Sequence, residues 1–185
     1  MKKAKLIVIS APSGAGKTTL VEKLLERNKN LTRSISYTTR SPRGNEVNRR
    51  DYFFISPDEF LKKKQDNFFL ESAKVFGQHY GTSRDFVLSH IKEGKPVVLA
   101  IDVQGMQQLK KQATKELPMI SIFIMPPSAG ELKTRLENRN TESTDEIAKR
   151  LNVAKEEIKA KALYDFVIVN HEVEEAAKAI EELIK

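Results

Sequence analysis

The sequence predicts an α/β fold in which helices pack on both faces of a central parallel sheet. Four apolar runs rich in β-branched residues are typical of buried parallel strands: Leu6 to Ile9, Val97 to Ile101, Ile120 to Met125 and Phe166 to Val169. Helical patterns separate these runs, and such alternation favours helices on both sides of the sheet. A chain of 185 residues suffices for one such core with small inserted lobes. We therefore expect a single domain over residues 1–185.

A glycine-rich loop follows the first apolar run directly and precedes a helical pattern. It consists of Ala11, Pro12, Ser13, Gly14, Ala15, Gly16, Lys17 and Thr18. In such a loop, backbone N–H groups and the positive end of a helix dipole converge on phosphate oxygens. Lys17 would reach the outer phosphates, and the Thr18 hydroxyl would ligate the magnesium ion that accompanies the nucleotide. Apart from Ala11, which stands where the pattern has glycine, the spacing predicts a P-loop three-layer fold that binds a nucleoside triphosphate.

Two segments interrupt the alternation of strands and helices. Residues 34–82 are rich in Arg, Tyr, Phe, Asn and Gly, so we expect a small inserted lobe of short strands there. Within it, a capping box and a proline predict a short helix from about Pro57 to Gln65. A second insertion, at about 127–150, contains a helix, a turn and the start of another helix. The core is then expected to comprise about residues 1–33, 83–126 and 151–185.

Composition narrows the partners and the compartment. The net charge of +7 fits either a nucleic-acid surface or a pocket for small polyanions, but the basic residues are scattered and clusters such as 62–64 are short. Without a zinc-finger, cold-shock or RNP-type pattern, we expect no nucleic-acid binding. No apolar run approaches the roughly 20 residues that span a bilayer, and the chain has no cysteine. These features predict a cytoplasmic protein without membrane contact. They do not distinguish a monomer from a homodimer, and both are kept as expectations.

A phosphate loop by itself does not separate a GTPase switch, an ATPase motor and a small-molecule kinase. The chain lacks the Asn-Lys-x-Asp guanine motif of the switch GTPases and is too short for most motors. A small kinase needs a second pocket for the acceptor and mobile arginines that neutralise the transferring phosphoryl group. We therefore look for these two features in the insertions.

The first insertion contains Ser36-Tyr37-Thr38-Thr39-Arg40-Ser41-Pro42-Arg43-Gly44-Asn45-Glu46, followed by Asp51-Tyr52-Phe53-Phe54. Together with Lys17 and the pair Arg139 and Arg150, this segment resembles the guanylate kinase family, and the resemblance covers essentially the whole chain. Its most specific part runs from Thr-Thr-Arg-x-Pro-Arg to Asp-Tyr-x-Phe. Members of that family phosphorylate GMP with ATP, so the resemblance implies transfer of the γ-phosphate of Mg-ATP to GMP or dGMP, in purine nucleotide metabolism.

The resemblance makes residues 34–82 the GMP-binding lobe. It implies that Arg40, Arg43, Tyr52 and Tyr80 hold the GMP phosphate, and that Ser36, Glu71, Thr82 and Asp102 recognise guanine. Arginine forks and phenol hydroxyls suit a dianionic phosphate. Carboxylates matched to the guanine donors would be left unpaired by adenine, which disfavours it. Asp102 has a second possible role, because many phosphate-loop proteins keep an acid for magnesium-bound water at the end of this strand.

On the donor side, the resemblance implies that Asn170 lies by the adenine ring and that residues 127–150 form a helical lid over ATP. Lys17, Arg43, Arg139 and Arg150 would then stabilise charge on the transferring phosphoryl group, with Mg²⁺ bound alongside ATP. Two alternatives remain open. A binding module that has lost catalysis is expected to lack the loop lysine or the GMP arginines, which this chain keeps. A phosphate-loop kinase for another acceptor would bind GMP weakly.

Overall fold

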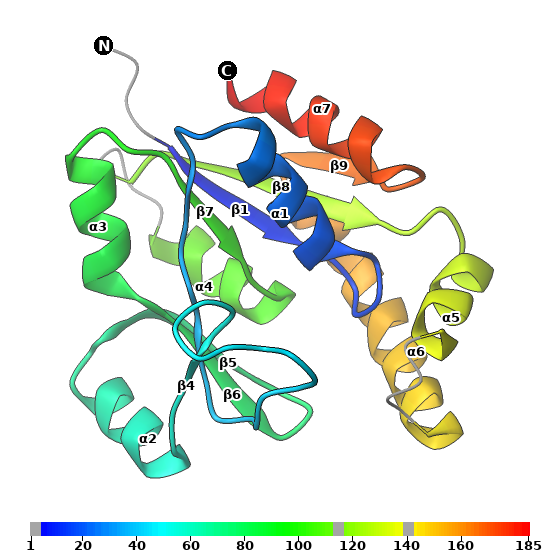
Figure 1. The fold of residues 1–185 in the computed structure, drawn as a ribbon, viewed down its shortest axis with the longest axis horizontal. Helices are drawn as coiled ribbons and strands as arrows, with labels where there is room; N and C mark the ends of the chain where they lie inside the picture. Colours follow the sequence, from blue (N-terminus) through cyan, green and yellow to red (C-terminus); the bar gives the residue numbers. More distant parts are fainter. Residues whose placement is uncertain (1–4, 113–116, 139–142) are drawn as a thin grey trace.

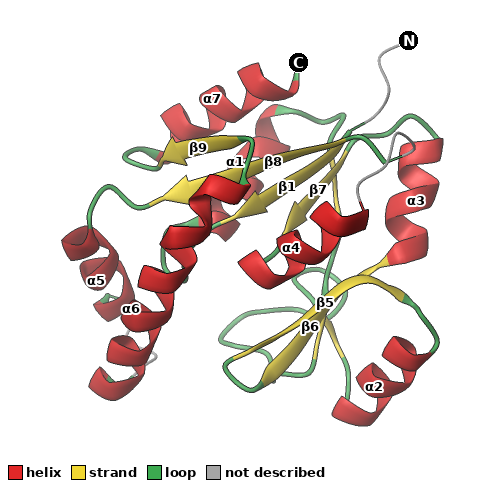
Figure 2. Cartoon of the chain, turned by 180° about the vertical axis from the view of Figure 1, so that it is seen from behind, coloured by secondary structure: helices red, strands yellow, loops and turns green. Residues whose placement is uncertain are grey.

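The computed structural model describes residues 5–112, 117–138 and 143–185. Their central feature is a five-stranded parallel sheet with the strand order β2-β7-β1-β8-β9 (Figures 1 and 2). Its strands have these bounds: β1 Leu6–Ser10, β2 Thr32–Arg33, β7 Val97–Ala100, β8 Met119–Met125 and β9 Phe166–Val169. The predicted α/β fold with a central parallel sheet is confirmed.

Side chains of β1 alternate between two hydrophobic layers, because successive residues of a strand point to opposite faces. Ile7 and Ile9 belong to the layer with helices α1 (Lys17–Arg27) and α7 (Val173–Ile184). Leu6 and Val8 belong to the opposite layer, with α3 (Arg84–Lys92) and α4 (Val103–Gln112). All five residues of β1 are buried. The strand that leads into the phosphate loop is thus held rigidly from both faces and by two neighbouring strands.

A second sheet has the strand order β4-β3-β6-β5 and lies beside one end of the core (Figure 1). Its strands are β3 Tyr37–Thr38, β4 Phe53–Phe54, β5 Phe69–Val75 and β6 Gln78–Ser83. Helix α2 (Pro57–Gln65) has the bounds that the sequence predicts, because Pro57 starts it and the Ser56 hydroxyl accepts the Glu59 N–H at 3.1 Å. We call residues 34–83 the small lobe.

Helices α5 (Ala129–Glu137) and α6 (Thr144–Lys159) extend from the same end of the core as the small lobe and lie across from it, at the lower right of Figure 1 (Figures 1 and 2). Helix α5 starts two residues before the predicted Glu131, because the Ser128 hydroxyl caps it. The predicted capping box of α6 is present, with Ser143 and Glu146 each accepting the other's backbone N–H. A 3₁₀ turn, η1 (Ala160–Leu163), connects α6 to β9.

Two features of the sheet differ from the sequence-based expectation. Strand β2 was not predicted, because its two residues have no apolar pattern and it exists only by pairing with β7. Strand β9 was expected to be buried, but Phe166, Val167 and Val169 are between 39% and 46% exposed, since β9 is an edge strand with β8 as its one neighbour in the sheet. None of the helices in the described ranges has the length and apolar character needed to cross a membrane.

Candidate functional site

The loop between β1 and α1 adopts a backbone that only glycine accommodates easily at two positions. Gly14 and Gly16 have φ angles of 93° and 88°, in the left-handed region that L side chains rarely adopt. A Cβ atom at position 16 would also lie 2.7 Å from Nδ2 of Asn170. Helix α1 begins at Lys17 directly after the loop, so its positive dipole end faces the loop, as a phosphate site requires.

Asn170 connects this loop to the parallel sheet. Its side chain is buried, and Nδ2 donates to the Ala15 carbonyl at 3.0 Å, while its backbone N–H donates to the Met125 carbonyl at the end of β8. The carboxamide therefore ties the phosphate loop to the sheet and is not among the residues that line the cavity described next. Its role beside adenine stays a prediction.

The loop opens into a cavity of about 820 Å³ that it shares with the small lobe and α6. Most of the predicted site residues line this cavity: Ala11, Pro12, Ser13, Gly14, Gly16, Lys17, Thr18, Ser36, Arg40, Arg43, Tyr52, Glu71, Tyr80, Asp102 and Arg150. Ala15, Thr82 and Asn170 lie behind its wall, and Arg139 lies outside the described residues. The structure thus brings residues from four separate segments of the chain to one cavity: the phosphate loop, the small lobe, the end of β7 and helix α6.

Lys17 lines the cavity and lies near three carboxylates. Its Nζ donates to the Ile101 carbonyl at 3.0 Å, just beyond the end of β7. Burial lowers the pKa of Lys17, and the nearby charges of Asp102, Glu157 and Glu71 oppose that shift. Asp102 accepts the Gly105 N–H at 2.8 Å and so caps the start of α4. The charge of Asp102 acts on both Lys17 and Glu71, which is compatible with both roles predicted for Asp102.

Glu71 is a buried carboxylate in the small lobe, on β5. The Thr82 hydroxyl, on the neighbouring strand β6, donates to Glu71 Oε1 at 2.5 Å. Burial raises the pKa of Glu71 to about 7, although the Thr82 hydrogen bond acts in the opposite direction. Thr82 therefore contacts Glu71 directly while lying behind the cavity wall. The other carboxylate oxygen packs against α4, where a Cβ at position 105 would lie 2.4 Å from Oε2.

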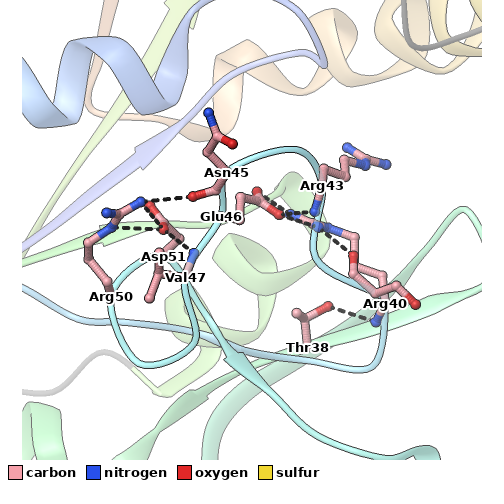
Figure 3. A network of polar contacts seen from close by, with 9 residues as sticks. Thr38, Arg40, Arg43, Asn45, Glu46, Val47, Arg50 and Asp51 are labelled. Atoms are coloured by element: carbon pink, nitrogen blue, oxygen red, sulfur yellow. Dashed lines mark hydrogen bonds and ion pairs between the residues drawn. The ribbon is translucent and has the colours of Figure 1, made fainter.

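Arg40 is buried and forms a two-pronged ion pair with Glu46 (Figure 3). Its Nη1 and Nη2 lie 2.6 and 2.7 Å from the two Glu46 oxygens, and Nη1 also donates to the Ser41 carbonyl at 2.8 Å. Burial disfavours the charge on Arg40, but the hydrogen bonds and charge of Glu46 prevail and raise its pKa. The Arg40 hydrogen bond in turn lowers the pKa of Glu46. Sequence reasoning gave Glu46 no role.

The other residues predicted to hold a phosphate surround Arg40. Its guanidinium carbon lies 4.9 Å from the ring centroid of Tyr52, whose ring meets Tyr80 edge to face at 6.1 Å. The Arg43 backbone N–H donates to Glu46 at 2.8 Å, and the Arg43 side chain points away from Glu46 (Figure 3). Two guanidinium groups and two phenols therefore share one wall of the cavity, an arrangement suited to a dianionic phosphate.

Helix α6 supplies Arg150 and Glu157 to the opposite wall. Arg150 Nη1 donates to the Ser13 hydroxyl of the phosphate loop at 2.8 Å. Burial raises the pKa of Glu157, and Lys17 and the Ser13 backbone oppose that shift. Glu157 and Phe76, which also lines the cavity, are residues that sequence reasoning missed. Neither Glu157 nor Phe76 lies in a recognisable motif. For Glu46 a signal exists, because it lies six residues after Arg40, and a buried arginine needs a carboxylate partner.

A phosphate loop, a shared cavity and an arginine-rich second wall define a phosphate-loop α/β protein with a site for two ligands. The family model described as guanylate kinase matches residues 3–185. A guanylate kinase of Caldanaerobacter subterraneus subsp. tengcongensis is 45% identical over 99% of this chain and 87% of its own length. One from Wolbachia pipientis wMel is 44% identical over 97% of this chain and 88% of its own length.

A solved structure agrees with these sequence matches. The crystal structure of guanylate kinase from Anaplasma phagocytophilum superposes with a TM-score of 0.83 at 34% identity, covering 100% of this chain and 86% of that one. The chain belongs to the guanylate kinase family.

Proposed function

We propose that this protein is a nucleoside monophosphate kinase that transfers the γ-phosphate of ATP to GMP or dGMP, giving ADP and GDP. The observation that carries this proposal is the shared cavity. The phosphate loop lines one part of it, and the small lobe lines another part with arginines, tyrosines and a buried carboxylate. A donor and an acceptor can therefore meet within one enclosure, as direct phosphoryl transfer requires.

On the acceptor side, Arg40, Arg43, Tyr52 and Tyr80 would hold the GMP phosphate. Glu71 would accept N–H groups of guanine, oriented by the Thr82 hydroxyl, while Ser36 and Asp102 complete the recognition. Adenine would leave the hydrogen bonds that the buried Glu71 accepts from guanine unmade, and an unsatisfied charged group costs more than the roughly 1 to 3 kcal/mol of a neutral one. This difference favours guanine.

On the donor side, the phosphate loop from Ala11 to Thr18 would cradle ATP. Lys17 would exchange its bond to Ile101 for the transferring phosphate, joined by Arg43, Arg150 and Arg139. A phosphate oxygen of GMP attacks in line, and it is already ionised, so no side chain has to remove a proton. Catalysis then comes from positioning, charge neutralisation and exclusion of water.

The donor set of this cavity fits a magnesium ion that arrives with the nucleotide. The described residues contain no group of three or more acidic, histidine or cysteine side chains able to hold a metal. Magnesium is commonly held by phosphates, waters and one or two protein oxygens, and the exposed Thr18 hydroxyl in the cavity offers one such oxygen. When bound, the ion would neutralise phosphate charge.

A coupled assay of ADP formation with GMP, AMP, CMP and UMP as acceptors tests the proposal. We expect turnover with GMP and little with the others. Lys17→Ala should abolish turnover and leave GMP binding nearly intact, because Lys17 serves the donor. Glu71→Gln should weaken GMP selectively. Equal rates with AMP and GMP would refute the assignment of the acceptor.

A further inference from the structure

The tip of the β5–β6 hairpin holds an aromatic residue in a backbone conformation that suits it poorly. Val75 pairs with Gln78, so Phe76 and Gly77 alone form the turn. Their φ angles are 47° and 79°, the pattern of a type I′ turn, whose first position favours Asn, Asp or Gly. Turn formation therefore does not account for a phenylalanine at position 76.

The Phe76 ring instead contacts an arginine from the opposite wall of the cavity. The guanidinium carbon of Arg150, on α6, lies 4.7 Å from the centroid of the Phe76 ring. Both residues line the cavity, and Phe76 is still 46% exposed. A large apolar side chain that is half exposed and strained, yet stacked on a cation, indicates a purpose beyond core packing.

The stacking does not use the N–H groups of Arg150. An aromatic ring covers the flat face of a guanidinium, whereas its N–H groups point outward in the plane. Arg150 Nη1 accordingly donates to the Ser13 hydroxyl while the ring contact is made. The ring thus restricts the rotation of a long side chain without competing for its hydrogen bonds.

The contact also joins the two halves of the site. The strands on either side of Phe76 carry Glu71 and Tyr80, which face the acceptor part of the cavity. Arg150 reaches the phosphate loop through Ser13. A movement of the small lobe would therefore shift the ring against which Arg150 rests.

We propose that Phe76 is a positioning residue for phosphoryl transfer: its ring holds Arg150 over the phosphate loop and makes the placement of that arginine depend on the small lobe. This inference rests on the proposed function and deepens it. Phe76 acts through Arg150. Loss of the ring is therefore expected to lower kcat more than it changes the KM of either substrate.

Phe76→Asn is the sharpest test, because asparagine suits the turn better than phenylalanine. We expect an unchanged or higher denaturation midpoint, KM values close to those of the wild type, and a kcat lowered about fivefold, the size of a typical cation–π contact. Phe76→Tyr keeps the ring and should retain full kcat. The matched control is Leu61→Ala on α2 of the same lobe, since Leu61 is equally exposed, at 46%, and is not a lining residue.

A double-mutant cycle separates positioning of Arg150 from a general effect on the lobe. In an Arg150→Met background, Phe76→Asn should cause no further loss of kcat, because the ring has no guanidinium left to position. An equal loss of kcat on Phe76→Asn in the wild-type and Arg150→Met backgrounds, or full kcat in the single variant Phe76→Asn, would overturn this inference and leave the proposed function intact. A wild-type protein that forms no ADP with GMP would overturn the proposed function as well.

Discussion

Replacing Glu71 by glutamine should stabilise the protein without nucleotide above neutral pH. The carboxylate is buried within the small lobe, where the Thr82 hydroxyl donates a hydrogen bond to it, and the charge of Lys17 offsets little of the cost of its burial. Glutamine keeps the size of the side chain and an oxygen that can accept the same hydrogen bond. The substitution therefore removes mainly the cost of burying a charge.

The raised pKa of Glu71 sets the magnitude and the sign of the change in unfolding free energy with pH. Its pKa is about 7 in the folded protein against 4.5 ordinarily, and each unit corresponds to about 1.4 kcal/mol. The folded state therefore holds a proton between pH 4.5 and 7 that the unfolded state has lost. Stability from this group is fully present at low pH and falls as pH rises through that window, by about 3 kcal/mol in total. Glutamine does not titrate, so the variant escapes this loss.

Urea denaturation of wild type and Glu71→Gln at pH 5 and pH 8, without nucleotide, measures the difference. We expect the free energy of unfolding of Glu71→Gln minus that of the wild type to be about 2 to 3 kcal/mol larger at pH 8 than at pH 5. Glu26→Gln is the control, because its side chain is 66% exposed and pairs only at the surface with Lys23. A difference between Glu71→Gln and wild type that stays constant with pH would refute the reasoning.

Three further outcomes are expected. Guanosine, which has no phosphate to titrate, should bind about tenfold more weakly per pH unit below 7, because its N–H groups need ionised Glu71; calorimetry at pH 5.5 and 8 checks this, and equal affinities would contradict it. Gly105→Ala should raise the KM for GMP but not for ATP, since its Cβ would lie 2.4 Å from Glu71 Oε2; steady-state kinetics measures both. Glu46→Gln should destabilise the protein by about 2 kcal/mol in urea denaturation, because Arg40 is buried and loses its counter-charge; a loss below about 0.5 kcal/mol would make the pair equivalent to a surface ion pair.

The sequence predicts those elements whose signals are local. The phosphate loop is recognisable because its glycines, lysine and threonine stand at a required spacing between a strand and a helix. Helix α2 has the predicted bounds because a capping serine and a proline mark its start. Strand β2 could not be predicted, since Thr32 and Arg33 have no apolar pattern and pair with a strand far along the chain. The exposure of β9 follows from its place at the sheet edge, which alternation alone does not indicate.

The residues of the site also divide into those with a local sequence signal and those that depend on distant parts of the chain. The residues that line the cavity were predicted where a motif or the family resemblance named them. Glu46, Glu157 and Phe76 were not, because their importance depends on what the fold places opposite them. A phenylalanine before a glycine is unremarkable in a sequence. It becomes informative when the turn requires a positive φ and an arginine lies against the ring.

The charges in the cavity explain how a site rich in cations stays folded without phosphate. Arg40 is paired with Glu46, and Lys17 lies near Asp102, Glu157 and Glu71. The phosphate oxygens of a bound nucleotide must therefore replace or share the carboxylate partners of these cations. The free energy of nucleotide binding is then the difference between the ion pairs made with phosphate and those made with carboxylates. This exchange limits ground-state affinity, because a buried cation that already has a partner gains little from a second anion. In the proposed reaction, the charge of the transferring phosphoryl group would develop between the two walls, within reach of Lys17 and of Arg150, which donates to the Ser13 hydroxyl of the phosphate loop. The arrangement is thus expected to stabilise the transition state more than either bound substrate, which is the condition for raising kcat.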